Sequence, residues 1–224
     1  MEPIAYIETP FDQKFGIPRQ SGMAATPGRV VFYPKYRIAE MVRGLESYDY
    51  LWLIWRFETH NVWHPTVRPP RLGGNQRLGV LATRSPFRPN PIGLSSVKLQ
   101  KVTIDDECGP MLHVIGVDLR NHTEIYDIKP YLSYTDCHPN VQCGIAKDAD
   151  DRILEILFDD SISIDETFKH ELRQVLSHDP RPRYQNDKNR IYSMSYAGYQ
   201  VRFSIDSNCM TILSVEPTFV QTSD

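Results

Sequence analysis

Short runs of β-branched and aromatic residues, bounded by proline or glycine, limit the fold of this chain more than any other feature. One helix is expected among them, between Ile38 and Tyr48, with Gly44 as a candidate stop. Many short strands with one helix predict a closed or nearly closed β-barrel rather than alternating βαβ units. The alternation of Val97, Leu99 and Val102 is broken by one step, which indicates a bulge. The expected strands are Pro3–Thr9, Arg29–Tyr33, Leu51–Phe57, Leu78–Ala82, Leu94–Ile104 and Met111–Leu119.

The composition changes at Lys147–Arg152 (KDADDR), a polar acidic link that indicates a domain boundary. Beyond it we expect a helix with Ser163 and Glu166 as its capping box, ending at Asp179–Pro180. The expected strands of this part are Ile153–Phe158, Ile191–Tyr196, Tyr199–Ile205 and Met210–Val215. The predicted fold is therefore mainly β, with an N-terminal β-barrel domain with few short helices over residues 1–147 and a small C-terminal α+β domain over residues 153–224.

Basic residues are concentrated in two segments, although the net formal charge is −3. Thr59–Ile104 contains seven Lys or Arg and no Asp or Glu. Gln13–Ala39 contains five Lys or Arg and likewise no Asp or Glu. This segregation favours an anionic partner such as a nucleic acid or a phosphate-bearing ligand. The alternative is that acids from elsewhere fold against these segments and balance their charge.

The stretch Arg77–Leu99 (RLGVLATRSPFRPNPIGLSSVKL) is both stiff and cationic. It places Arg77, Arg84 and Arg88 and three prolines between two strand-like runs, as expected of a loop that holds an anion. The glycines Gly73-Gly74 lack the Lys-Ser/Thr ending of a phosphate loop, and no G-x-G-x-x-G opens a helix. We therefore exclude a P-loop and a dinucleotide-type Rossmann site.

Other site classes have weak support. No apolar run approaches 18 residues and the N-terminus lacks a signal-peptide pattern, so we expect a cytoplasmic protein without a membrane span. The four cysteines form neither a disulfide framework nor a C-x-x-C zinc pattern, so we expect free thiols and no metal. His60 and His64 are candidates for a base or a substrate contact, or pack as loop histidines. Asp127–Tyr131 (DIKPY) is either a surface turn with a solvated ion pair or a polar site.

Several motifs together carry a family resemblance. LGVLATRSPFRPNPIGLSSVKL closely resembles the signature of the TsaA-like (TrmO, YaeB) family, which methylates N6-threonylcarbamoyladenosine in tRNA. The similarity extends from about Ile4 to Pro217, with further landmarks in the family's order. These are IPRQ (Ile17–Gln20), GLESYDYL (Gly44–Leu51), PTVRPPRLGG (Pro65–Gly74), DIKPY (Asp127–Tyr131) and DPRPRY (Asp179–Tyr184).

The resemblance implies an N-terminal β-barrel that binds S-adenosylmethionine, a smaller C-terminal domain and a homodimer with the cofactor near the subunit interface. The family usually has Phe-His after the aromatic strand, whereas Phe57 is followed here by Glu58, and His60 comes two residues later. His60 and Asn61 are therefore carried over only as candidates. The implied cofactor-contacting residues are Pro18, Arg19, Gln20, His60, Asn61, Arg84, Leu94, Asp127, Ile128, Lys129 and Pro130.

The implied reaction is methyl transfer to a urea-like nitrogen next to the tRNA anticodon, and Asp127, His60 and Tyr131 are the candidate bases. Arg88 or Arg71 suits the substrate's threonine carboxylate. The rival interpretations are a non-catalytic RNA-binding barrel and a methyltransferase of this family with a different acceptor. The candidate phosphate contacts with the anticodon loop are Arg68, Lys98 and Lys101, with Arg181 and Arg183 from the C-terminal domain.

Overall fold

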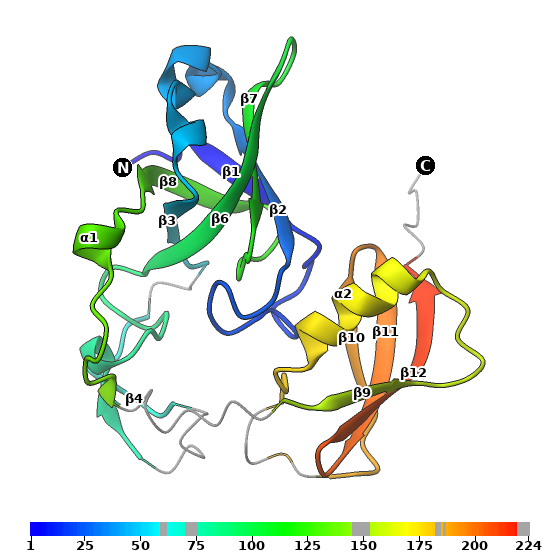
Figure 1. Cartoon of the computed structure of the whole chain (residues 1–224). Coiled ribbons are helices and arrows are strands. Elements are labelled where there is room, and N and C mark those ends of the chain that lie inside the picture. Colours follow the sequence, from blue (N-terminus) through cyan, green and yellow to red (C-terminus); the bar gives the residue numbers. More distant parts are fainter. Residues whose placement is uncertain (59–61, 70–75, 145–152, 182–184, 186, 219–224) are drawn as a thin grey trace.

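The computed structural model describes residues 1–58, 62–69, 76–144, 153–181, 185 and 187–218. It consists of a barrel and a smaller unit of one sheet and one helix (Figure 1). None of the helices in these ranges is long and apolar enough to cross a membrane.

The barrel is closed by six antiparallel strands in the order β1-β2-β7-β6-β3-β8, which confirms the predicted barrel. β8 pairs with both β1 and β3 and so completes the ring. The short strands β4 (Thr66–Val67) and β5 (Leu78–Gly79) form a separate pair. The barrel strands are β1 (Ala5–Glu8), β2 (Pro27–Phe32), β3 (Tyr50–Arg56), β6 (Ile92–Asp105), β7 (Gly109–Ile115) and β8 (Thr123–Pro130).

Three local predictions were wrong. The expected turn Asp127–Pro130 is extended and belongs to β8, because barrel closure gives its backbone partners that a sequence motif does not reveal. The expected strand Leu78–Ala82 pairs only at Leu78–Gly79 and then turns into a 3-10 helix, η5 (Val80–Ala82). The expected helix between Ile38 and Tyr48 is two 3-10 turns, η2 (Ala39–Val42) and η3 (Leu45–Ser47), because Gly44 has a φ of 82°. A further 3-10 turn, η1, spans Pro34–Tyr36.

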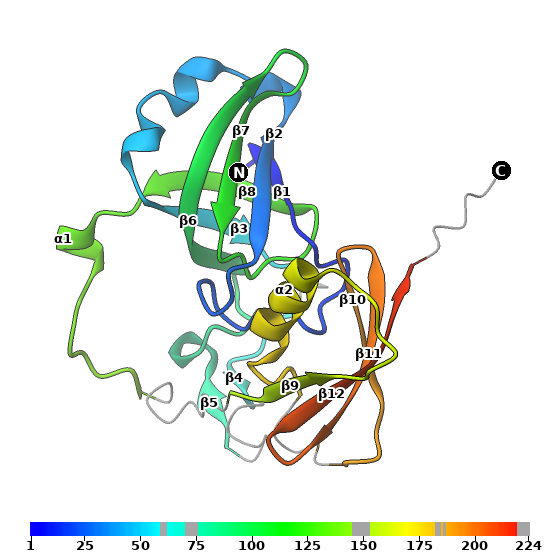
Figure 2. The same ribbon diagram turned by 45° about the vertical axis from the view of Figure 1, so that its right-hand side comes forward.

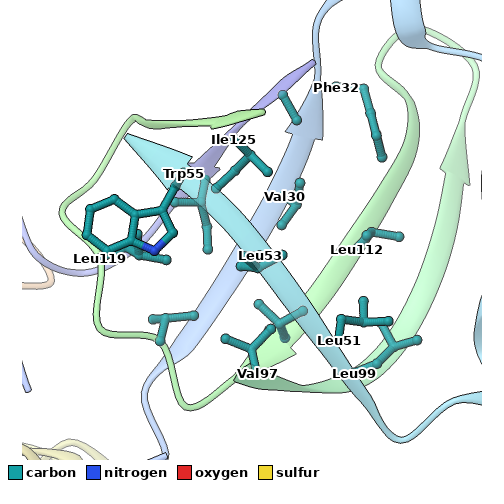
Figure 3. Packing of buried hydrophobic residues seen from close by; sticks show 14 of the residues in the cluster. Val30, Phe32, Leu51, Leu53, Trp55, Val97, Leu99, Leu112, Leu119 and Ile125 are labelled. Atoms are coloured by element: carbon teal, nitrogen blue, oxygen red, sulfur yellow. The ribbon is translucent and has the colours of Figure 1, made fainter. Parts of the chain in front are cut away.

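Alternating side chains of the strands fill the barrel (Figure 3). Leu51, Leu53 and Trp55 of β3 point inward, so Tyr50, Trp52 and Ile54 lie on the outer wall. Trp55 occupies the space beside Gly93 of β6, where a Cβ atom would lie 2.2 Å from the indole. The predicted bulge in β6 is confirmed by a register shift between Leu99 and Lys101.

The C-terminal unit packs helix α2 (Glu166–Leu176) on a sheet of order β10-β11-β12-β9. The side chain of Asp165 caps α2 by accepting from the N–H groups of Thr167 and Phe168, so the predicted capping role of Ser163 was wrong. Leu172 and Leu176 of α2 are fully buried against the sheet. The strands are β9 (Glu155–Phe158), β10 (Tyr192–Tyr196), β11 (Tyr199–Asp206) and β12 (Cys209–Pro217).

The segment between β1 and β2 joins the two units. Phe11 and Ala24 are buried in the core of the C-terminal unit, and the Ala197 N–H donates to the Pro10 carbonyl oxygen at 2.8 Å. Helix α2 lies between one end of the barrel and the C-terminal sheet (Figure 2). The loop that carries the IPRQ motif is therefore held between the two units.

Candidate functional site

The outer wall of the barrel brings together two of the predicted site segments. Strand register places Leu94 opposite Ile54 and Ile54 opposite Asp127, in one row across β6, β3 and β8. The next row contains Ser96, Trp52 and Lys129. Leu94 is 51% exposed. Leu94, Asp127 and Lys129 thus share one solvent-facing surface.

The DIKPY residues divide between the two faces of β8. The Asp127 carboxylate pairs with Lys129 Nζ at 2.9 Å and accepts from the Ile128 N–H at 2.9 Å. Ile128 packs against the barrel core. The neighbouring phenol of Tyr131 lies against the Trp52 ring, with centroids 5.6 Å apart. Partial desolvation raises the pKa of Tyr131, so its phenol stays protonated at neutral pH and can donate a hydrogen bond.

The IPRQ loop reaches the same wall through Gln20 and Ser21. The Ser96 N–H of β6 donates to Ser21 Oγ at 3.1 Å, and Arg84 Nη1 donates to Gln20 Oε1. Arg84 is exposed. The Ser21–Ser96 hydrogen bond thus joins Gln20 and Arg84 to the strand that carries Leu94, and we call Gln20, Arg84 and the Leu94–Asp127 row the outer-wall surface.

Arg19 points the other way, toward the C-terminal unit. Its Nη2 donates to the carbonyl oxygens of Asp179 and Arg181, at 2.7 and 2.9 Å. Two carbonyl acceptors on one guanidinium hold the IPRQ loop to the chain that follows α2. The buried Pro18 lies beside it and lines the cavity described below.

A half-buried carboxylate that sequence analysis missed, Asp118, hydrogen-bonds with this loop. The Trp55 indole N–H donates to Ser95 Oγ at 2.9 Å, and the Ser95 hydroxyl donates to Asp118 Oδ1 at 2.6 Å. Burial raises the pKa of Asp118, against the opposing effects of the Ser95 hydrogen bond, the N–H groups of Asp118 and Ser21, and the Arg84 charge. In the sequence, the one feature that marks Asp118 is its position as an acid between the apolar residues Val117 and Leu119.

Asp118 lies at the edge of a cavity of about 850 Å³ between the barrel and the C-terminal unit. Trp55, Leu119 and Thr123, at the end of the barrel, also line it and are each less than 10% exposed. Phe57 and Phe87 line it from the barrel side, and Val175 and His178 from α2 and the residues after it. This volume is within the roughly 300–1,000 Å³ of small-molecule sites.

A second cavity, of about 450 Å³, adjoins the signature loop. Ile54, Tyr126 and Arg88 line it, and Trp55 and Arg56 line both cavities. The Arg88 guanidinium donates to the Thr83 carbonyl oxygen at 3.1 Å, and this hydrogen bond stabilises the loop that carries both residues. The two cavities therefore flank the end of β3.

The predicted RNA-contacting residues are not gathered in one place. Lys98 and Lys101 lie on β6, and Arg68 is exposed just after β4. Arg181 is 7% exposed and makes a bidentate pair with Asp179, at 3.0 and 2.9 Å, so its guanidinium is committed to a carboxylate rather than open to phosphate. The predicted residues His60, Asn61, Arg71 and Arg183 lie outside the described residues.

The four cysteines are free thiols. Within the described ranges, His, Cys, Asp and Glu form no group of three or more that could hold a metal ion.

Comparison with known proteins matches both parts of the chain. A family model described as the tRNA-methyltransferase O N-terminal domain matches residues 6–137, and one described as the TrmO C-terminal domain matches residues 158–218. A tRNA (adenine(37)-N6)-methyltransferase of Escherichia coli is 34% identical over 96% of this chain and 97% of its own length.

Two further comparisons, one with a sequence and one with a solved structure, involve Pseudomonas aeruginosa. A putative S-adenosylmethionine-dependent methyltransferase, RcsF, is 37% identical over 83% of both chains. The crystal structure of TrmO superposes with a TM-score of 0.76 at 30% identity and covers 96% of this chain and 95% of its own.

Proposed function

The chain belongs to the tRNA-methyltransferase O family, and from this premise we propose that it is an S-adenosylmethionine-dependent methyltransferase that acts on N6 of an adenosine in tRNA. The observation that carries the proposal is the match of both domains to this family, with a relative of that activity similar along nearly the whole chain. The finer part of the proposal is the acceptor, N6-threonylcarbamoyladenosine next to the anticodon.

The outer-wall surface suits the cofactor. Arg84 is exposed and cationic, with Gln20 as its hydrogen-bond partner, so it can donate to the carboxylate of the cofactor's methionine part. The exposed Leu94 provides an apolar contact on the same wall. S-adenosylmethionine would supply a methyl carbon bonded to a sulfonium. We propose that Gln20, Arg84, Leu94, Asp127, Lys129 and Pro130 bind it, with His60 and Asn61 as further contacts. Pro18, Arg19 and Ile128, which the motifs also offered, face the C-terminal unit or the barrel core instead.

The negatively charged carboxylate of the proposed acceptor suits the basic signature loop. Arg88 lines the smaller cavity with its guanidinium oriented by the Thr83 carbonyl, and a planar guanidinium matches a carboxylate such as that of the threonyl group. Arg71 is the alternative contact. Lys98, Lys101 and Arg68 are proposed to contact RNA phosphates, with Arg183 from the C-terminal domain.

The outer wall also supports a homodimer. Tyr50, Ile92 and Leu94 are large apolar side chains that are 43–51% exposed on the same wall. Contiguous exposed apolar surface of this kind marks interaction sites. Light scattering should give the mass of a dimer, and a monomer at micromolar concentration would refute this part of the proposal. The cytoplasmic location stays a prediction.

The activity is tested with S-adenosylmethionine labelled in its methyl group and two preparations of one tRNA, with and without the threonylcarbamoyl group. We expect label in the modified tRNA only. Equal labelling of both preparations would indicate a different acceptor. If cofactor and tRNA bind and no label is transferred, the chain is an RNA-binding barrel without this activity.

A further inference from the structure

The large cavity between the two units has the features of a nucleobase site. Its aromatic lining side chains are Phe15, Trp55, Phe57 and Phe87, and aromatic rings are the groups on which an unstacked base packs. Lys14 and Arg120 carry positive charge at the same cavity, and Arg120 is paired with Glu58 at 2.7 Å. Aromatic and basic side chains around one cavity suit an adenine nucleotide that has left the RNA stack.

One carboxylate borders both this cavity and the residues proposed for the cofactor. Asp118 lines the cavity and accepts from Ser95, whose buried side chain lies on the opposite face of β6 from the exposed Leu94. Its link to the residues proposed for the cofactor is the IPRQ loop: the Ser21 N–H, next to Gln20, faces the Asp118 carboxylate, and the Arg84 charge acts on the same group. Asp118 therefore borders the cavity and the Gln20–Arg84 end of the surface proposed for the methyl donor.

The carboxylate has room for one more hydrogen bond. It faces the Ser95 hydroxyl and the N–H groups of Ser21 and of Asp118 itself, whereas two carboxylate oxygens offer about four acceptor positions. No other lining carboxylate among the described residues is free, because Glu58 is paired with Arg120. An N–H group of a bound base can donate a hydrogen bond to the acceptor position of the Asp118 carboxylate that these three groups leave unfilled.

We propose that this cavity binds the acceptor adenine of the tRNA and that the Asp118 carboxylate accepts the proton of its N6 during methyl transfer. The inference rests on the proposed function and adds an acceptor site and a catalytic residue to it. Asp127, the base expected from the sequence, is already paired with Lys129, and Tyr131 is held protonated. Asp118 has neither constraint.

The step balances in atoms and charge. As N6 forms its bond to the methyl carbon, the N6–H bond breaks and the proton moves to Asp118, while the carbon–sulfur pair stays on sulfur. The products are N6-methylated adenosine, a neutral thioether and a protonated carboxyl, which returns its proton to solvent. A positioned base of this kind contributes about 10²–10⁴ in rate.

Asp118→Asn tests the catalytic role, since asparagine keeps an acceptor for Ser95 and cannot take the proton. The matched control is Asp12→Asn, because Asp12 lies on the same loop as Lys14, accepts a hydrogen bond from Asn121 and lines neither cavity. We expect Asp118→Asn to lower kcat at least a hundredfold and to change the dissociation constants of S-adenosylmethionine and tRNA less than twofold. Asp12→Asn should match the wild type.

The wild-type kcat should also rise with pH through one ionisation that is absent from the residual activity of Asp118→Asn. Charged groups that line the cavity with Asp118 are Lys14, Arg19, Arg56, Glu58, Arg120 and His178, and Arg84 acts on it from outside. His178 is the imidazole among the side chains that line this cavity, and His178→Gln, which removes it, must retain the ionisation. An unchanged kcat in Asp118→Asn, or loss of the ionisation in His178→Gln, would overturn the catalytic role.

The base site is tested by binding alone, without turnover. An anticodon stem–loop is compared with one that lacks the target base, using the wild type and Phe87→Ala. We expect Phe87→Ala to weaken binding of the intact stem–loop about tenfold and to leave the abasic one unaffected, because only the intact RNA has a base to stack on the ring. Equal effects on both RNAs, or weaker binding of S-adenosylmethionine instead, would overturn the base site. Because this readout needs no methyl transfer, it stands even if the proposed activity fails.

Discussion

At the scale of single residues, the proposed cofactor contact Arg84 and the proposed base Asp118 lie in contrasting environments. Arg84 is exposed with Gln20 as its partner, whereas Asp118 is half-buried and accepts from Ser95, which in turn accepts from Trp55. Sequence motifs identified Arg84 because it lies in the signature stretch. They missed Asp118, because its environment is made by β6, the IPRQ loop and the barrel end, which are far apart in the sequence.

Arg84→Ala should weaken S-adenosylmethionine binding about tenfold to a hundredfold, the value of one or two hydrogen bonds to a charged group. Isothermal calorimetry measures it directly. Lys98→Ala is the comparison variant and should instead lower tRNA affinity and its salt dependence, with cofactor affinity unchanged. Unchanged cofactor affinity in Arg84→Ala would remove its assigned role.

Asp118 should also affect stability in a pH-dependent way. Burial raises its folded-state pKa above the ordinary value of 3.8, so the folded protein holds this proton more tightly than the unfolded chain. Its contribution to stability is fully present below pH 3.8 and is lost as the pH rises through the folded pKa. Asp118→Asn should therefore melt close to the wild type in acid and at a higher temperature at pH 7. A variant that melts lower at pH 7 would contradict this.

At the scale of elements, the β-barrel and the C-terminal helix followed from sequence patterns, and the exceptions have physical causes. Alternation and turn residues are local signals, so β1, β2, β3, β6 and β10–β12 were expected close to where they lie. The DIKPY segment has the local pattern of a turn, yet two neighbouring strands supply its hydrogen bonds and make it β8. For the same reason the row of Leu94, Ile54 and Asp127 could not be predicted, because it depends on strand register.

The contact between β3 and β6 gives a direct test of packing. Gly93→Ala would place a Cβ atom 2.2–2.5 Å from atoms of the Trp55 ring, so either the strand or the indole must move. We expect a loss of about 1–3 kcal/mol in the free energy of unfolding. Gly79→Ala is the control, because nothing lies within 4 Å of the position that its Cβ atom would take. Denaturant titration measures both, and equal stability of the two variants would contradict the packing described.

At the scale of the whole molecule, the IPRQ loop connects the two units. Arg19 binds two carbonyl oxygens after α2, and Phe11 and Ala24 belong to the C-terminal core. Arg19→Leu should loosen this junction, because it leaves the Asp179 and Arg181 carbonyls without this donor. Hydrogen exchange should be faster in the IPRQ loop and after α2, and unchanged in the strands of the barrel. If the exchange rates of these segments are the same in the variant and the wild type, Arg19 does not hold the units together.

The central claim concerns the position of a methyl group on tRNA. The direct measurement uses S-adenosylmethionine with a deuterated methyl group, tRNA that carries the threonylcarbamoyl group, and mass spectrometry of the digested nucleosides. The deuterated methyl group is predicted on N6 of the threonylcarbamoyl adenosine beside the anticodon and on no other nucleoside. A deuterated methyl group on any other atom or nucleoside, or none on tRNA that the protein binds together with the cofactor, would contradict the account.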